Sequence, residues 1–275
     1  MSRKLTDLRA KIEASPKFQQ GLVARAAVRD HLESIAVNSN VKVPSDHVRV
    51  AVFSDTHHGS LYHNAEAYAA YAAECRKEGV EFAVHAGDVL EGHRLYRGQE
   101  FEVAELGWEA QLNAFDAGAP DFGCPVRFIA GNHDISYLRA AGVHVGVALA
   151  AKRSSWVFLG QTQGTVNIEA PAGKFSIKLL HPGGGSAYAL SYRPQKIVEQ
   201  LEGGTKPDML VIGNYHKSEW IPSYRNVSVV QGGCFQHQTN FMVEKGISAH
   251  VGGWIFDLAF GKGCVSQKAR WIGFP

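Results

Sequence analysis

Aspartate, asparagine and histidine residues stand directly after five apolar runs of the sequence, and no cysteine accompanies them. The five groups are Asp55-Thr56-His57, Gly87-Asp88, Gly131-Asn132-His133-Asp134, His181, and Gly213-Asn214-Tyr215-His216. Carboxylate, amide and imidazole donors without thiolates suit borderline divalent metals such as manganese, iron, cobalt or zinc. The residue types therefore indicate a metal centre, provided that the fold brings the five groups together.

Taken singly, most of these groups also have a purely structural explanation. Asp55 and His57 could be a turn aspartate and a surface histidine, and Asp88 could cap a helix. The run from Asn132 to Asp134 is harder to explain in this way, because three hydrogen-bonding residues in a row after a buried strand need partners. Since the whole set occurs in one chain, we interpret the groups as parts of one site.

The apolar runs have the length of buried strands and alternate with helical patterns. Strands are predicted at 48–53, 81–86 and 125–130, with helices at 65–78 and 101–115 between them. Shorter strands and one helix at 190–202 follow, the strands at 156–159, 165–168, 174–180, 209–212, 227–231 and 254–260. This alternation predicts a parallel or mixed sheet. Open α/β sheets place ligands at the carboxyl ends of their strands, where all five groups stand.

Composition bounds the class of protein. The chain has 275 residues, of which 45% are hydrophobic and 20% charged, enough for one large domain or one domain with an appendage. No apolar run approaches the roughly 20 residues of a membrane helix, and the first residues lack the apolar block of a secretory signal. We therefore expect a cytoplasmic protein without a membrane partner. The four cysteines have no zinc-type spacing, and the net charge of +2 argues against a strongly basic surface.

The five groups resemble the motifs of the calcineurin-like metallophosphoesterase family, which are D-x-H, GD, GNH(D/E), a lone H and GHxH. They occur in the family's order over residues 48 to about 260. The stretches HPGGGSAYALSYRPQKIVEQ and AHVGGWIFDL also resemble the branch of the family found in prokaryotes and their viruses. The family's fold is a four-layer α-β-β-α sandwich with two mixed β-sheets. The resemblance implies an α/β protein that hydrolyses phosphoric esters.

The resemblance also implies two divalent metal ions, with manganese favoured over iron, zinc, cobalt or nickel. One ion would be held by Asp55, His57 and His216, the other by Asn132, His181 and Asn214, with Asp88 bridging the two. A hydroxide shared by the ions would attack phosphorus in line with the leaving oxygen. His133 would protonate that oxygen as general acid, and Asp134 would orient the His133 ring.

Asn214 is the one ligand position that departs from the family pattern, because the first histidine of GHxH is replaced by an amide. An amide oxygen can coordinate a metal, but it is a weaker donor than imidazole. Three explanations stay open: a natural variant with one tight and one labile metal, an active enzyme for which the amide suffices, or a histidine replaced deliberately. Asn214→His is expected to raise metal occupancy and rate.

Residues beside the motifs are assigned more loosely. His58 and His85 are expected to pack or to support ligands, because neighbours on an extended strand point to opposite faces. Glu91 could hydrogen-bond to the ligand shell or be a solvated helix-start glutamate. The expected substrate-binding residues are Arg97, Gly184, Tyr188 and Arg193. Gly184 belongs to a glycine run whose N–H groups could hold a phosphate.

Residues 1–45 predict a helical, basic appendage in front of a catalytic domain of residues 46–275. The appendage carries eight lysine and arginine residues against four acidic ones. We favour a solvated helix packed on the main domain over a nucleic-acid-binding arm, because charge runs without a motif are weak evidence.

Two metals and an acid fit several phosphoesterases. We favour a phosphodiesterase or nuclease on nucleic acid or nucleotides, because a protonated His133 assists a poor alkoxide leaving group. The first alternative is a small-molecule phosphatase or cyclic-nucleotide phosphodiesterase. The second is a binding scaffold that Asn214 has weakened as a catalyst. The oligomeric state stays open.

Overall fold

Two six-stranded β-sheets pack face to face, as the computed structural model of residue 15 and residues 38–185 and 187–275 describes them. Sheet A runs in the order β1 (Ser39–Lys42), β6 (Gln163–Ala170), β7 (Gly173–Leu180), β8 (Met209–Ile212), β10 (Val227–Gly232) and β9 (Ser218–Tyr224). Sheet B runs in the order β12 (Cys264–Gly273), β11 (Gly252–Gly261), β2 (His47–Phe53), β3 (Phe82–His85), β4 (Val126–Ile129) and β5 (Trp156–Gly160). Each sheet contains parallel and antiparallel pairs, so both are mixed.

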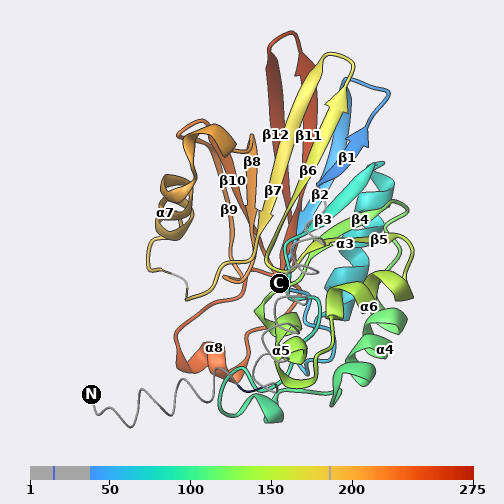
Figure 1. Cartoon of the computed structure of the whole chain (residues 1–275), viewed down its shortest axis with the longest axis vertical. Helices are drawn as coiled ribbons and strands as arrows, with labels where there is room; N and C mark the ends of the chain where they lie inside the picture. The colour runs from blue at the N-terminus through green and yellow to red at the C-terminus, as the bar shows by residue number, and fades with distance from the viewer. Residues whose placement is uncertain (1–14, 16–37, 186) are drawn as a thin grey trace. The chain divides into compact units, whose positions relative to one another are not determined.

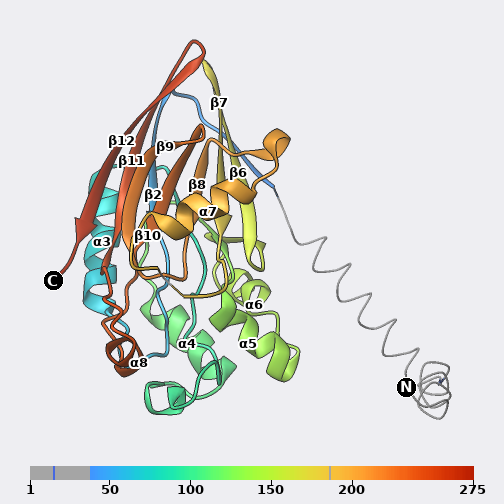
Figure 2. The same ribbon diagram turned by 90° about the vertical axis from the view of Figure 1, so that its left-hand side faces the viewer.

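Helices cover the outer faces of the two sheets (Figures 1 and 2). The helices beside sheet B are α3 (Ala65–Lys77), α4 (Trp108–Gly118), α5 (Asn132–Ala141) and α6 (Val145–Lys152), and α7 (Tyr192–Gln200) lies on sheet A. The connecting segments contain α8 (Asn240–Glu244) and the 3-10 turns η1 (Gln99–Phe101) and η2 (Gly203–Thr205). The layers follow the order α-β-β-α, which confirms the predicted four-layer sandwich.

The side chains of strand β2 alternate between the core that lies between the two sheets and the contact with helix α3. Val48, Val50 and Val52 point into the core between the sheets, where they meet Ile177 of β7 and Val211 of β8. The other side of the strand faces α3, and this face of sheet B carries aromatic rings. The hydrophobic contact on both faces fixes the register of β2, because a slip of one residue would exchange its core and helix sides.

The aromatic contact between β2 and α3 is centred on Phe53, the last residue of the strand. Its ring centroid lies 5.7 Å from those of Tyr68 and Tyr71, and it stacks on Phe122 at 5.0 Å. Phe53 is fully buried, so its packing anchors the strand end. The polar residues that begin at Ser54 therefore leave a rigid element.

All predicted strands are present, with ends that differ by at most two residues. The helix predicted at 101–115 is wrong at its start: α4 begins at Trp108, because Gly107 turns the chain with a φ of 92°. The sequence prediction did not include helices α5, α6 and α8 or strands β1, β9 and β12.

The predicted N-terminal appendage lies mostly outside the described residues. Its last part does not: residues 39–42 form β1, which pairs in parallel with β6 from Ser39 opposite Val166 to Lys42 opposite Glu169. Val43 is buried in the core between the sheets. Sheet A therefore extends across the predicted boundary at residue 45.

Candidate metal centre

The five polar groups meet where strands of both sheets end. Sheet B supplies Asp55 and His57 after β2, Asp88 after β3, and Asn132 and His133 after β4, while sheet A supplies His181 after β7 and Asn214 and His216 after β8. Segments far apart in the sequence are thereby brought together, as the alternating strand pattern predicts.

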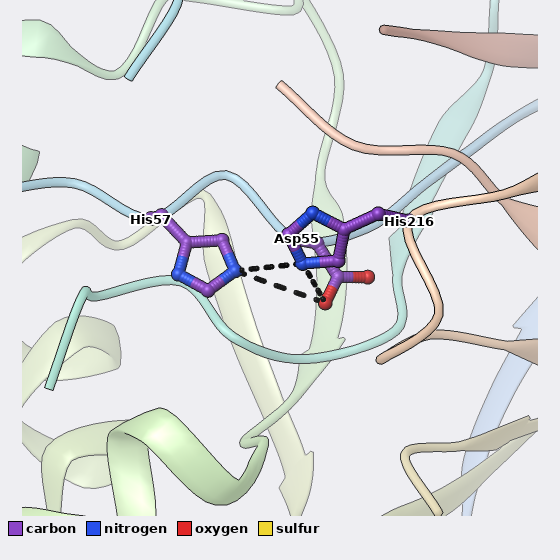
Figure 3. A group of neighbouring side chains, drawn as sticks. All are labelled: Asp55, His57 and His216. Carbon is purple, nitrogen blue, oxygen red and sulfur yellow. Dashed lines mark hydrogen bonds and ion pairs between the residues drawn. The ribbon is translucent and has the colours of Figure 1, made fainter. Parts of the chain in front are cut away.

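One donor group consists of Asp55, His57 and His216 (Figure 3). Nε2 of His57 lies 3.1 Å from Nε2 of His216, and Oδ1 of Asp55 lies 3.9 and 3.4 Å from these two nitrogens. All three side chains are buried. Two imidazole nitrogens and a carboxylate oxygen thus converge on one point.

A second donor group lies beside the first and contains Asp55, Asp88 and His181. Nε2 of His181 lies 3.0 Å from Oδ2 of Asp88 and 3.0 Å from Oδ1 of Asn132. Asp55 is common to the two groups, whereas Asp88 belongs to the second. That Asp88 bridges two ions stays a prediction.

Hydrogen bonds on the far side of two imidazole rings leave their Nε2 atoms for the site. Nδ1 of His57 lies 3.0 Å from Oε2 of Glu91, and Nδ1 of His181 lies 2.7 Å from the carbonyl oxygen of Ala86. Because a carboxylate or carbonyl oxygen accepts from Nδ1–H, the neutral ring has its lone pair on Nε2. This is the arrangement of a metal-binding histidine, so the residues present fit a divalent ion.

The backbone at the site takes a conformation that few residue types tolerate. Five non-glycine residues have positive φ angles between 50° and 76°: Asp55, His57, Asp88, Asn214 and His216. Aspartate, asparagine and histidine are the types enriched in this left-handed region. The side chains suited to hold a metal are therefore also those that the turns accept.

Two motif glycines are explained by close contacts. A Cβ added to Gly131 would lie 2.1 Å from Oδ1 of Asp88, and one added to Gly213 would lie 2.3 Å from the carbonyl oxygen of Ala86. Real Cβ atoms do not approach other atoms so closely. Glycine at position 131 lets the loops after β3 and β4 of sheet B approach each other, and glycine at position 213 lets the loop after β8 of sheet A approach the end of β3.

Opposite charges offset the cost of burying the site. Burial would raise the pKa of Asp55, but the nearby His216 and His181 lower it. Burial would likewise raise the pKa of Asp88, but the nearby His181 and His133 lower it. Burial would lower the pKa of His181, but the Asp88 carboxylate raises it to about 9. In the metal-free site, a protonated His181 therefore supplies the positive charge that a bound metal ion would otherwise supply.

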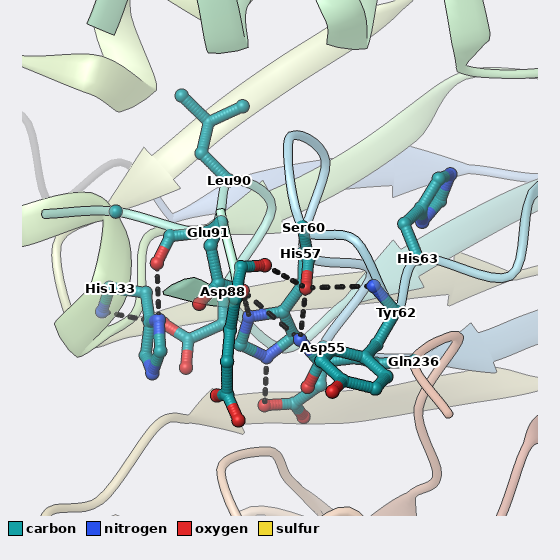
Figure 4. Close-up of polar contacts among 12 residues, drawn as sticks. Asp55, His57, Ser60, Tyr62, His63, Asp88, Leu90, Glu91, His133 and Gln236 are labelled. Carbon is teal, nitrogen blue, oxygen red and sulfur yellow. Dashed lines mark hydrogen bonds and ion pairs between the residues drawn. The ribbon is translucent and has the colours of Figure 1, made fainter. Parts of the chain in front are cut away.

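Glu91 connects the metal ligands with the predicted general acid (Figure 4). Its carboxylate meets His57 and also accepts hydrogen bonds from Gln99 at 2.9 Å and Gln236 at 3.0 Å. Its backbone carbonyl oxygen accepts a hydrogen bond from Nδ1 of His133 at 2.5 Å. Glu91 is 1% exposed, so it is not a solvated glutamate at a helix start. Its role is to hydrogen-bond to the residues around the donor groups.

Asp134 occupies a different place from the one predicted. Its carboxylate accepts hydrogen bonds from the backbone N–H groups of Val89, Leu90 and Gly131, at 3.1, 2.9 and 2.8 Å. Burial and the nearby Asp88 charge raise its pKa to about 7. The Glu91 carbonyl, rather than Asp134, meets Nδ1 of His133, and Asp134 joins the loops after β3 and β4 instead.

Asn214 binds its surroundings through both backbone and side chain. Its backbone N–H donates to the Asp55 carboxylate, at 3.1 and 3.0 Å from the two oxygens. Its side-chain Nδ2 donates to the carbonyl oxygen of Gly184 at 2.8 Å. The amide is thus tied to the glycine loop after His181, and whether its Oδ1 coordinates a metal stays a prediction.

A cavity of about 580 Å³ opens beside the donor groups. Of the predicted substrate-binding residues, Gly184 lines it. Arg193 instead binds the carbonyl oxygen of Gly183 at 3.0 Å and the hydroxyl of Tyr215 at 3.2 Å, so it braces the glycine loop. Arg97 and Tyr188 are exposed and do not line this cavity.

His58 and His85 are buried outside the donor groups, as expected. Nε2 of His85 lies 3.2 Å from the Thr56 hydroxyl, and its Nδ1 accepts from the backbone N–H of Gly87. The His58 ring packs at 5.4 Å from Phe115. Both support the loops that carry ligands.

Sequence reasoning missed the cavity residues from two other segments. The cavity is also lined by Leu95, Tyr96, Phe241, Met242 and Ile247, together with Arg139 of α5. These residues belong to no motif and have ordinary types. Only the adjacency of segments about 140 positions apart identifies them.

Comparisons with known proteins agree with this geometry. A model of the calcineurin-like phosphoesterase family matches residues 48–227. DNA polymerase II small subunits from two strains of Halobacterium salinarum are 25% identical over 238 residues, which cover 74% of this chain and 47% of those proteins. The chain therefore spans about half the length of the curated relatives it matches.

A solved structure shares the fold at low sequence identity. GAP50 of Plasmodium, an anchor in the inner membrane complex, is 10% identical with a TM-score of 0.51, over 82% of this chain and 84% of that one. Vacuolar protein sorting 29 of Cryptosporidium parvum is 13% identical with a TM-score of 0.40, over 83% and 99%. In the described part of this chain, no helix combines the length and the apolar character needed to cross a membrane.

Proposed function

Because the chain belongs to the calcineurin-like phosphoesterase family, we propose that it is a metal-dependent phosphodiesterase that acts on nucleic acid or nucleotides. One observation carries the proposal. Two groups of buried carboxylate and imidazole donors, each with its ligand atoms within 4.8 Å of one another, lie beside a cavity large enough for a substrate. Motif residues from both sheets build this arrangement.

The proposed ligands of the first ion are the members of the first donor group, and those of the second ion are the set that the family resemblance implies. Asp55, His57 and His216 would hold one ion, Asn132, His181 and Asn214 the other, and Asp88 would stand between them. When bound, two divalent ions supply the Lewis acidity that activates water and takes up charge on the phosphoryl oxygens. Oxygen and imidazole donors without thiolate suit several borderline divalent metals, and manganese is favoured among them by the family resemblance.

His133 is the proposed general acid. The Glu91 carbonyl oxygen holds its Nδ1–H, so the protonated ring has its second N–H on Nε2. His133 also lines the cavity, and its backbone N–H donates to Oδ1 of Asp88 at 2.8 Å. The ring can therefore give a proton to a leaving oxygen beside the donor groups.

A diester of nucleic acid is favoured for two reasons. A proton donor matters most for a poor alkoxide leaving group, such as a nucleoside hydroxyl. The curated relatives are subunits of a DNA polymerase, which supports a nucleic-acid substrate. A small-molecule phosphatase or cyclic-nucleotide phosphodiesterase is the alternative within the same chemistry.

A binding scaffold is the second alternative, and Asn214 is the observation that favours it. The Asn214 side-chain nitrogen binds Gly184, and an amide is a weaker metal donor than imidazole. A scaffold would bind metal in stoichiometric amount and hydrolyse no phosphoester.

The test combines metal analysis with a substrate panel. Protein loaded with manganese is assayed on bis-p-nitrophenyl phosphate, p-nitrophenyl phosphate, cyclic nucleotides, and single- and double-stranded DNA. We expect two ions per chain and hydrolysis of the diester above the monoester. A monoester preference without polymer cleavage would exclude the nuclease, and full metal without turnover would favour the scaffold.

A further inference from the structure

The lining of the metal-centre cavity contains five apolar or aromatic residues as well as backbone and polar groups. An apolar wall is formed by these five residues, Leu95, Tyr96, Phe241, Met242 and Ile247. The rest of the lining includes the glycine run 183–185, several donor residues, and the polar side chains of Gln236 and Thr239. Phosphate chemistry alone needs no apolar surface, so the wall requires a separate explanation.

The wall is a fixed surface. The rings of Tyr96 and Phe241 stack with centroids 4.4 Å apart and an angle of 25°. The carboxylate of Glu102 accepts a hydrogen bond from the Tyr96 hydroxyl at 2.6 Å and another from the backbone N–H of Phe241 at 3.1 Å. Glu102 is 3% exposed. A buried carboxylate thus holds the two halves of the wall together, as expected of a preorganised binding surface.

The wall is also connected to the catalytic groups. The backbone N–H of Leu95 donates to Gln99, whose side-chain nitrogen donates to the carbonyl oxygen and the carboxylate of Glu91. Glu91 in turn binds His57 and His133. The wall therefore has a set position relative to the general acid.

Two positively charged side chains lie at the wall. Nζ of Lys245 lies 6.0 Å from the Phe241 ring centroid, and Arg139 lines the cavity near Leu95. An apolar surface beside cations is suited to a flat, uncharged group that carries phosphates on either side.

We propose that the apolar wall receives an unpaired nucleobase adjoining the scissile phosphodiester, so that the site selects single-stranded over double-stranded nucleic acid. The inference rests on the proposed function. The cavity of about 580 Å³ falls within the roughly 300–1,000 Å³ of small-molecule pockets, so it has room for a nucleotide beside the metals. In a duplex, both faces of a base are covered by its neighbours and its edge is paired, which leaves nothing to pack on the wall.

The first experiment compares three substrates with the manganese-loaded protein. They are a single-stranded oligonucleotide, the same strand annealed to its complement, and methyl p-nitrophenyl phosphate, which has no base. We expect kcat/KM on the single strand to exceed that on the duplex at least about tenfold, the size of one base contact. Equal cleavage of strand and duplex would overturn the inference.

The second experiment separates the wall from the metal chemistry. Phe241→Ala keeps the backbone N–H that Glu102 binds, and it should lower kcat/KM on the single strand about tenfold more than on methyl p-nitrophenyl phosphate. The control is Val243→Ala, on the same helix but 60% exposed and outside the cavity lining, and it should change neither substrate. Equal losses on both substrates with Phe241→Ala would overturn the inference.

The experiments distinguish a failure of the proposed phosphodiesterase activity from a failure of the base-binding role of the wall. If the unaltered protein hydrolyses none of the three substrates, the proposed phosphodiesterase activity itself fails. If it hydrolyses methyl p-nitrophenyl phosphate but Phe241→Ala shows no selective loss, only the base-binding role of the wall fails. Thermal melting checks that the variant is folded, and Ile247→Ala serves for the same comparison if it is not.

Discussion

The carboxylate of Glu91 lies 3.0 Å from Nδ1 of His57, on the side of the ring that faces away from the donor group. Burial would raise the pKa of Glu91, but the His57 hydrogen bond lowers it, so the carboxylate stays ionised. An ionised acceptor at this position sets the tautomer of His57.

Glu91→Gln should therefore weaken the metal centre without removing a proposed ligand. A glutamine side chain would present its NH2 group to at least one of the three donors His57, Gln99 and Gln236, so the hydrogen bonds that hold the His57 tautomer would be disrupted. We expect metal affinity and kcat/KM to fall about 10- to 100-fold. Metal titration and kinetics measure both, with the exposed Glu105→Gln as matched control; unchanged affinity would contradict the role.

Asn214→His should raise occupancy of the second metal and increase the phosphoesterase rate. Imidazole is the stronger donor, and the backbone N–H that binds Asp55 is kept. Histidine also tolerates the φ of 76° at this position. Metal content per chain and the rate at saturating manganese are the measurements. No change in either would show that residue 214 does not limit the site.

His133→Gln should affect substrates according to their leaving group. Loss of the general acid is expected to slow cleavage of a nucleoside diester about 10²- to 10⁴-fold. Bis-p-nitrophenyl phosphate should lose much less, because its leaving group needs no proton. Metal content should stay the same, since His133 is outside the proposed ligand set. Equal losses on both substrates would argue against acid catalysis by His133.

Metal binding at the His181 donor group should strengthen as the pH rises from 7 to 9. The pKa of His181 is raised to about 9 in the metal-free protein, so its proton must leave when Nε2 binds a cation. Affinity should increase up to about tenfold per pH unit and level off above pH 9. Calorimetry in two buffers of different ionisation enthalpy counts the released protons. A flat profile would contradict the assignment.

The raised pKa of His181 also determines how the stability of the metal-free protein depends on pH. Because the folded pKa of His181 lies above its ordinary 6.5, protonation stabilises the metal-free fold. This contribution is complete below pH 6.5 and disappears as the pH rises through about 9.

The donor residues could be predicted because strand endings and residue types are both local properties of the sequence. Asp55 and Asp88 stand after apolar runs that form the neighbouring parallel strands β2 and β3, and parallel strands bring such endings together. The role of Asp134 could not be predicted in the same way. A carboxylate beside His133 in sequence satisfies three backbone N–H groups instead, and this depends on how two loops approach.

The apolar wall was beyond sequence reasoning for a related reason. Tyr96 and Phe241 meet through the Glu102 carboxylate, although about 140 residues separate them in the chain. No periodicity marks either segment, because Tyr96 lies in a connection and Phe241 lies in α8, a helix of only five residues. Their juxtaposition follows from the closed sandwich, which supports both loops.

The left-handed turns at Asp55, His57, Asp88, Asn214 and His216 set a limit on engineering this protein. Such backbone strain costs roughly 1–3 kcal/mol at an ordinary residue, and glycine would relieve it. A laboratory selection that rewards heat resistance alone would therefore favour glycine at these five positions. The selected protein would be more stable, but it would have lost the residues of its metal centre.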